Sequence, residues 1–295
     1  GLYTAQGDSK TPFVANFIGL LINLLLDPLL ILGVGPFPRI EVAGAAVATV
    51  SAQFVVMFVM MVGVFRSKKE ENVLKGIRLF EPFSKEELGN ICKIGGPTAI
   101  QGMVYCMISM VLTRMVAAFG AEAIATQRVG GQIESVSWNT ADGFAAALNA
   151  FVGQNYGAKK MDRVQKGYRI SFWTVAIWGA LIMLAFIIFP GPIAGVFFHE
   201  EKAMEIAISY LIIIGFSEAF MCVELMTIGA LSGLGKTKLC SVISITATSM
   251  RIPLAMVLSR ASLGLDGIWW ALTLTSVAKG IIFYLAFRYQ MREKC

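Results

Sequence analysis

The amino-acid sequence predicts an all-α protein that crosses a membrane several times. Hydrophobic residues make up 56% of its 295 residues and charged residues only 15%, whereas soluble domains carry about 25% charged residues. The mean hydropathy is +0.69. Many apolar residues lie in uninterrupted runs, and a helix needs roughly 20 of them to cross the hydrocarbon core of a bilayer. These observations indicate a polytopic membrane protein.

Eight apolar runs predict eight transmembrane helices. In chain order they cover residues 12–34, 42–65, 90–118, 122–152, 167–189, 204–231, 238–259 and 265–287. The polar stretch between the second and third runs mixes both signs of charge with a few apolar residues, which is typical of a segment lying on a membrane surface. We therefore divide the chain into a two-helix part at 1–66, a cytoplasmic linker at 67–89 and a six-helix bundle at 90–295.

The distribution of basic residues predicts the orientation. An even number of helices places both ends of the chain on one side, and the loops of that side carry 18 of the 25 basic residues. The opposite loops carry four, namely Arg39, Arg114, Lys202 and Arg260. Cytoplasmic loops are enriched in Lys and Arg, so we expect a plasma or inner membrane protein with both ends in the cytoplasm. The same bias explains the net charge of +6 without a nucleic-acid partner.

Three short matches in the same order indicate an internal repeat. Lys10, Pro28 and Gly44 correspond to Lys236, Pro253 and Gly267, at offsets of 226, 225 and 223 residues. Such a repeat favours two parallel six-helix halves, as in two-lobed transporters. We therefore expect the eight helices to belong to a twelve-helix, two-lobe protein, with about four further helices before Gly1.

Several motifs together resemble the multidrug and toxic compound extrusion (MATE) family. They are Asn23-Leu-Leu-Leu-Asp27-Pro28, Gly35-Pro36-Phe37-Pro38, Val152-Gly153-Gln154-Asn155-Tyr156-Gly157-Ala158 and Gly229-Ala-Leu-Ser-Gly233-Leu-Gly235-Lys236. The resemblance extends over the whole chain and implies helices five to twelve of a twelve-helix transporter. It further implies an antiporter that expels amphiphilic, often cationic compounds in exchange for Na⁺ or H⁺.

The first apolar run contains a candidate cation site. Asn23 and Asp27 are four residues apart and share one helix face, and Pro28 removes a helical hydrogen bond and so frees a carbonyl nearby. These are oxygen ligands suited to Na⁺ or to a proton. The resemblance implies that Asn23, Asp27 and Thr49 form part of a cation site, whose remaining Asp would precede Gly1. The alternative is that Asn23 and Asp27 only cap a kinked helix. We expect no cofactor other than this coupling ion and no further metal site.

The later runs contain a second set of polar candidates. Glu134, Trp138 and Asp142 follow one another at four-residue spacing, so they share a helix face. The remaining candidates are Asn139, Glu218 and Glu224. Charge inside a bilayer is costly and marks function by default, so these residues are expected to line a substrate cavity or to relay protons. The alternative is that the acids form structural ion pairs with Arg251 and Lys279.

The sequence therefore predicts a secondary active antiporter that exports amphiphilic, cationic drugs or metabolites, because acidic residues at mid-membrane depth at least equal the basic ones. The alternative is a lipid-linked saccharide flippase of the same superfamily, which should expose a wider basic cavity. An integral-membrane enzyme is disfavoured by the single histidine and by the lack of a nucleophile elbow, a P-loop or HExxH. The expected partners are the substrate and membrane lipid, with no obligate protein partner.

Overall fold

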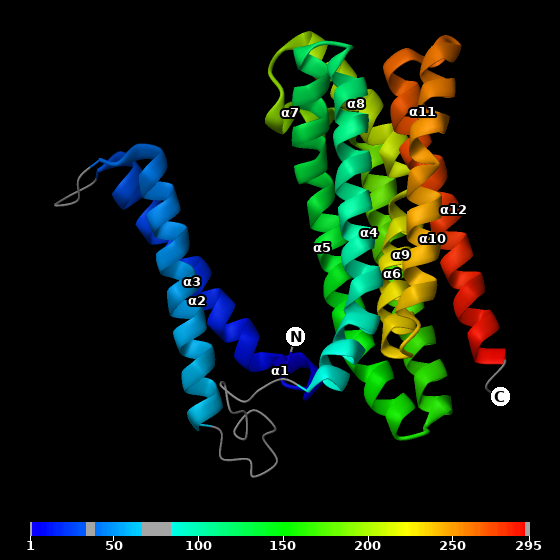
Figure 1. The fold of residues 1–295 in the computed structure, drawn as a ribbon. Coiled ribbons are helices and arrows are strands. Elements are labelled where there is room, and N and C mark those ends of the chain that lie inside the picture. Colours follow the sequence, from blue (N-terminus) through cyan, green and yellow to red (C-terminus); the bar gives the residue numbers. More distant parts are fainter. Residues whose placement is uncertain (1, 34–38, 67–83, 293–295) are drawn as a thin grey trace. The chain divides into compact units, whose positions relative to one another are not determined.

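The computed structural model describes residues 2–33, 39–66 and 84–292, and every regular element within them is a helix (Figure 1). The chain divides into two compact units, Gly1–Phe83 and Ser84–Cys295. Each unit has its own packed helices, and each is described by itself below.

The first unit contains α1 (Leu2–Ala5), α2 (Lys10–Leu32) and α3 (Glu41–Arg66). The start of α2 is fixed by Asp8, whose Oδ1 accepts hydrogen bonds from the backbone N–H groups of Lys10 at 3.1 Å and Thr11 at 3.0 Å. These bonds satisfy donors that have no partner within the helix. Helices α2 and α3 pack against each other along their length, so this unit is a helical hairpin.

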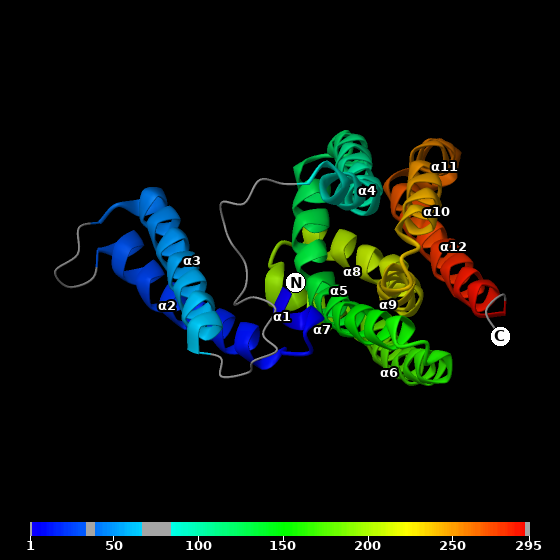
Figure 2. The same ribbon diagram turned by 60° about the horizontal axis from the view of Figure 1, so that its bottom comes forward.

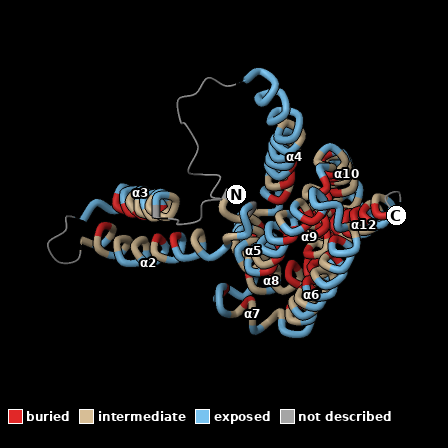
Figure 3. The backbone as a smooth tube through the Cα atoms, turned by 90° about the horizontal axis from the view of Figure 1, so that it is seen from below, coloured by how far each residue is buried: buried red, intermediate tan, exposed pale blue. Residues whose placement is uncertain are grey.

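The second unit is a bundle built around one central helix. Its elements are α4 (Lys85–Ala117), α5 (Ala121–Gly157), α6 (Met161–Ile188), α7 (Pro190–Phe197), α8 (Glu201–Gly215), α9 (Glu218–Gly233), α10 (Thr237–Ser249), α11 (Arg251–Leu258) and α12 (Gly264–Arg292), with a π-helical segment at Ser259–Leu263. Helix α9 packs against α5, α6 and α12 (Figures 1 and 2). Its Cys222, Met226 and Ala230 are fully buried, and buried positions gather along it in Figure 3.

The closest packing in this bundle is between α5 and α9, and it depends on glycine. A Cβ atom added to Gly229 would lie 2.3 Å from the carbonyl oxygen of Ala145, and one added to Gly233 would lie 2.6 Å from that of Asn149. Any side chain larger than hydrogen would overlap these atoms. The two glycines therefore allow the backbones to touch, as small residues do between membrane helices.

The described residues contain six or seven candidate membrane-spanning helices, where eight were expected. Among the described residues, six helical segments are long and apolar enough to span: Lys10–Leu32, Glu41–Phe65, Lys85–Ala117, Met161–Ile188, Thr237–Ala261 and Gly264–Arg292. Helices α8 and α9 meet at an angle of 51° and count as a seventh span if taken together. The run at 122–152 forms the single helix α5 but is not among them, because small and polar residues interrupt its apolar ones. The count of eight is therefore not confirmed.

The end of the predicted linker is helical. Residues 67–83 lie outside the described residues, and residues 85–89 form the start of α4. The Ser84 side chain accepts a hydrogen bond from the backbone N–H of Glu86 at 3.3 Å, and Glu86 and Glu87 place negative charge in the first turn. Capping and the helix dipole both favour a helix start here, one turn earlier than hydropathy indicates.

Candidate functional site

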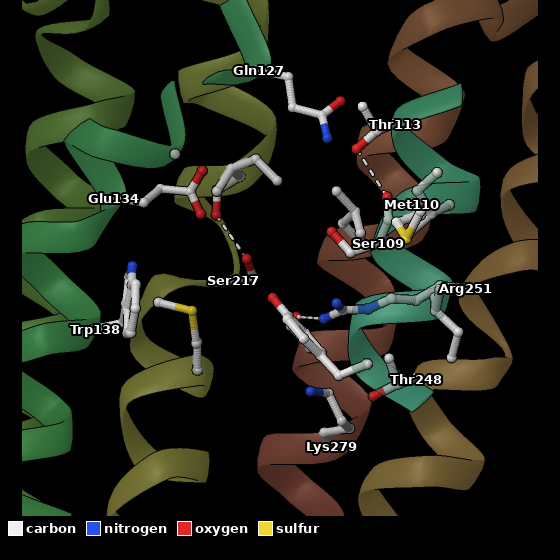
Figure 4. A pocket seen from close by; sticks show the side chains of 18 of the residues that line it. Ser109, Met110, Thr113, Gln127, Glu134, Trp138, Ser217, Thr248, Arg251 and Lys279 are labelled. Carbon is white, nitrogen blue, oxygen red and sulfur yellow. Dashed lines mark hydrogen bonds between the residues drawn. The ribbon is translucent and has the colours of Figure 1, made fainter. Parts of the chain in front are cut away.

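A cavity of about 1090 Å³ lies within the second unit. One wall is formed by α5 and by the bent pair α8 and α9, and the other by α4, α10, α11 and α12 (Figure 4). Apolar and polar side chains both line the cavity: the indole of Trp138 and the thioether of Met221 lie among hydroxyl, amide and charged groups. Such a mixture is typical of ligand pockets, whose volumes are usually about 300–1,000 Å³.

On the first wall, Glu134 of α5 faces Tyr210 of α8. The Tyr210 hydroxyl donates a hydrogen bond to the Glu134 carboxylate, and the ring is buried. A Cβ atom added to Gly130 would lie 2.2 Å from the Tyr210 ring. Gly130 therefore makes room for the ring one turn from the carboxylate that it binds.

On the opposite wall, Arg251 begins α11 and extends toward the cavity (Figure 4). Its Nε donates to the Thr275 hydroxyl at 3.1 Å and its Nη2 to the Ser276 hydroxyl at 2.9 Å. No carboxylate lies within 4.0 Å of the guanidinium among the described residues. Arg251 was one candidate for a structural ion pair, and in the described residues hydroxyls of α12 hold it.

Lys279 and Glu224 form an ion pair beside the cavity. The Lys279 Nζ lies 2.7 Å from Glu224 Oε1, and the two side chains are 8% and 6% exposed. The other carboxylate oxygen of Glu224 is buried and has no hydrogen-bond partner in the described parts of the chain. Both residues line the cavity, but their charges largely cancel.

Three of the expected residues do not line this cavity. Glu218 is fully buried, and its carboxylate oxygens have no hydrogen-bond partner among the residues that the structure describes. Asn139 is rotated about 100° from the face of Trp138, since a helix has 3.6 residues per turn, and it is exposed. Asp142 lies about 12 Å along α5 from Glu134 at 1.5 Å per residue, beyond the lining of α5, which ends at Trp138.

The lining of the cavity carries more basic than acidic residues. It holds two acidic residues, Glu134 and Glu224, and four basic ones, Arg114, Arg128, Arg251 and Lys279. From the sequence we expected only that the acids at mid-membrane depth at least equal the bases. Depth along a helix does not reveal that Glu218 is buried away from the cavity, that Asp142 lies beyond its lining along α5, or that Arg114 and Arg128 line it.

Sequence reasoning missed the residues that hold Arg251. Thr275 and Ser276 lie in α12, one turn before Lys279, and both are buried. Adjacent hydroxyl residues in an apolar run are common in membrane helices and carried no separate signal. Only the packing of α11 against α12 brings them to the guanidinium.

In the first unit, Asn23 and Asp27 lie on one face of α2, and each is partly buried. Asn23 Nδ2 and Asp27 Oδ1 are buried atoms without a hydrogen-bond partner among the described residues. The Thr49 hydroxyl of α3 donates to the carbonyl of Ala45 at 2.9 Å, which leaves its oxygen lone pairs available. The role of these three residues in cation binding remains a prediction.

Comparison with known proteins gives consistent matches. The MatE family model matches residues 97–257. The chain is 29% identical to a probable multidrug resistance protein NorM of Thermotoga maritima, over 97% of this chain and 62% of that protein. It is 27% identical to an FAD transporter of Shewanella oneidensis, over 96% of this chain and 62% of that protein. The chain thus spans less than two thirds of these relatives.

The fold is shared with solved structures. The MATE transporter VcmN of Vibrio cholerae in its bent form superposes with a TM-score of 0.84, at 21% identity, over 99% of this chain and 65% of that one. At this identity the likeness concerns the fold alone.

Proposed function

The chain belongs to the MATE family of membrane transporters, and we propose that the protein is a secondary active antiporter that exports amphiphilic small molecules in exchange for H⁺ or Na⁺. Alternating access between the two sides of the membrane would carry the substrate across. The proposal includes the orientation predicted from the basic loops, with both ends of this chain in the cytoplasm.

The observation that carries the proposal is the cavity of about 1090 Å³ within the second unit. It is large enough for a drug-sized molecule. Trp138 offers an aromatic face and Met221 an adaptable thioether, which suit apolar bodies of different shapes. Ser109, Thr113 and Gln127 add hydrogen-bonding groups along the same space (Figure 4).

Coupling to an ion is proposed at Asp27. A buried carboxylate oxygen without a partner is unfavourable, and binding a proton or Na⁺ removes that penalty. Asn23, one turn away, supplies an amide oxygen, and the Thr49 oxygen is the third proposed ligand. The support is the unpaired Oδ1 of Asp27 on the face of α2 that also carries Asn23, together with the Asn–Asp-Pro motif.

Two substrate classes are each supported by different observations. A cationic drug follows from the family resemblance and from the multidrug name of the T. maritima relative. An anionic substrate, or the lipid-linked saccharide alternative, is favoured by the basic majority of the cavity lining, and the S. oneidensis relative is named as a transporter of FAD.

The test is gradient-driven export by the full-length protein in proteoliposomes, with pH and Na⁺ gradients imposed separately. Ethidium and dansylglycine serve as fluorescent substrates of opposite charge. Asp27→Asn, which keeps the shape but cannot ionise, should abolish export driven by either gradient. Asp162→Asn, in the first turn of α6, is the matched control and should export normally.

Undiminished gradient-driven export by Asp27→Asn would refute coupling at this residue. Equal export with and without gradients, in the wild-type protein, would refute the antiporter itself.

A further inference from the structure

We propose that the cavity of the second unit binds the anionic head of an amphiphilic substrate at Arg251. The ligands that fit are carboxylates, sulfonates or phosphate monoesters joined to an apolar or aromatic body. Their transport rests on the proposed export function, whereas their binding rests on the cavity alone.

The guanidinium of Arg251 is held in place before any ligand arrives. The Thr275 hydroxyl donates its hydrogen to the carbonyl of Ala271 at 2.8 Å, so its oxygen lone pairs are free to accept from Arg251 Nε at 3.1 Å. Ser276 accepts from Nη2 at 2.9 Å. Both hydroxyl residues are buried in α12. A side chain fixed in this way loses little conformational entropy when it binds a ligand.

Arg251 keeps donors to spare for a ligand. A guanidinium has five N–H groups, of which two are engaged by the hydroxyls of α12. The remaining ones lie in a planar fork, which matches the two oxygens of a carboxylate or phosphate. Because Thr275 and Ser276 are neutral, they orient the guanidinium without cancelling its charge.

No acid among the described residues forms an ion pair with Arg251. Glu224 is paired with Lys279 at 2.7 Å. Glu134 lies on the opposite wall, where Tyr210 binds its carboxylate, and its charge attracts Arg251 across the cavity (Figure 4). A charge without an ion-pair partner at membrane depth is costly unless it meets water or a substrate. An anionic head seated between the two walls would supply that partner.

Further basic residues near Arg251 attract anions, and apolar side chains of the cavity can contact the apolar part of the ligand. Arg114 and Arg128 also line the cavity and raise the local concentration of anions near it. Trp138 lies on the wall opposite Arg251 (Figure 4), and Met221 lines the cavity from α9, which belongs to that wall. A ligand with its head at Arg251 would therefore place its apolar body against them.

The experiment compares three ligands that share one fluorophore: dansylglycine, which is anionic, dansylamide, which is neutral, and dansylcadaverine, which is cationic. Binding to the purified full-length protein in nanodiscs is measured by fluorescence titration. Dansylglycine should bind more tightly than the other two. Arg251→Gln should weaken dansylglycine binding by at least about tenfold, since a hydrogen bond to a charged group contributes more than the free energy that corresponds to that factor. It should not weaken dansylcadaverine binding, because Arg251 repels the ammonium group.

Two further variants sharpen the assignment. Arg251→Lys, which keeps the charge but lacks the fork, should give an intermediate affinity for dansylglycine. Arg169→Gln, on an exposed position of α6, removes the same charge away from the cavity and should have no effect. Equal affinities for the three ligands, or unchanged dansylglycine binding by Arg251→Gln, would overturn the site.

Failure of this site and failure of the antiporter are distinguishable. Selective dansylglycine binding without gradient-driven export would support the anion site and refute the antiporter. Gradient-driven export of ethidium, together with no preference for dansylglycine, would refute the anion site alone.

Discussion

Removing one partner of the Lys279–Glu224 pair should destabilise the protein far more than removing both. Lysine Nζ and glutamate Oε1 are 2.7 Å apart, and each side chain is less than one tenth exposed. In Lys279→Met, the carboxylate would lose its charge partner and its only hydrogen bond in the described residues, because its other oxygen has none. Breaking a buried pair in this way costs about 3–5 kcal/mol. The lower end is expected here, because the pair borders a cavity that water can enter.

The apparent Tm of the purified protein, followed by thiol-reactive fluorescence during heating, measures this loss. A destabilisation near the lower end should reduce the Tm by roughly 6–12 °C, at about 2–4 °C per kcal/mol for a bundle of this size. The double variant Glu224→Gln/Lys279→Met replaces the charges with neutral groups of similar shape and should regain most of the loss, since no charge is left buried. A wild-type Tm for Lys279→Met, or losses that simply add in the double variant, would refute the reasoning.

Two further substitutions test the wall that contains Glu134. Tyr210→Phe removes the donor to the Glu134 carboxylate and should cost about 1.5–3 kcal/mol, the contribution of a hydrogen bond to a charged group; an unchanged Tm would contradict that bond. Gly130→Ala places a Cβ against the Tyr210 ring. The overpacking should reduce the free energy of unfolding by about 1–3 kcal/mol and so lower the Tm. Gly131→Ala is the matched control, because nothing lies within 4 Å of its added Cβ, and it should raise stability by about 0.5–1 kcal/mol. Equal effects of the two alanines would exclude the close approach of the ring.

The helices could be predicted closely from the sequence because hydropathy and helix boundaries are local properties. The run at 12–34 corresponds to Lys10–Leu32, and that at 42–65 to Glu41–Arg66. The apolar run alone places the start of the third long helix at residue 90. The hydrogen bond from the Glu86 N–H to the Ser84 side chain, which is also a local property, explains why α4 begins earlier. The 51° bend between α8 and α9 was not predicted, because a single run of apolar residues covers both helices.

The site was less predictable, because it depends on which way each side chain faces in the bundle. Glu134 and Glu218 carry the same charge inside the predicted spans, yet one lines the cavity and the other lies within the protein. For Arg251 the sequence suggested a carboxylate as one possible partner, whereas in the structure α12 provides two hydroxyls. Such partners come from packing between distant segments, and neither periodicity nor depth specifies them.

The contact of α5 with α9 at Gly229 and Gly233 determines which parts of the cavity can move. Two helices whose backbones touch at successive turns cannot slide past each other there without steric overlap, so we expect α5 and α9 to move together. Helix α12 is joined to α9 in the same way, because a Cβ atom added to Gly280 would lie 2.7 Å from the carbonyl oxygen of Phe220. Arg251, held by the hydroxyls of α12, is then expected to keep its place relative to Trp138 and Met221. Helix α4 packs mainly against α10, so a change in the width of the cavity is expected to come from α4.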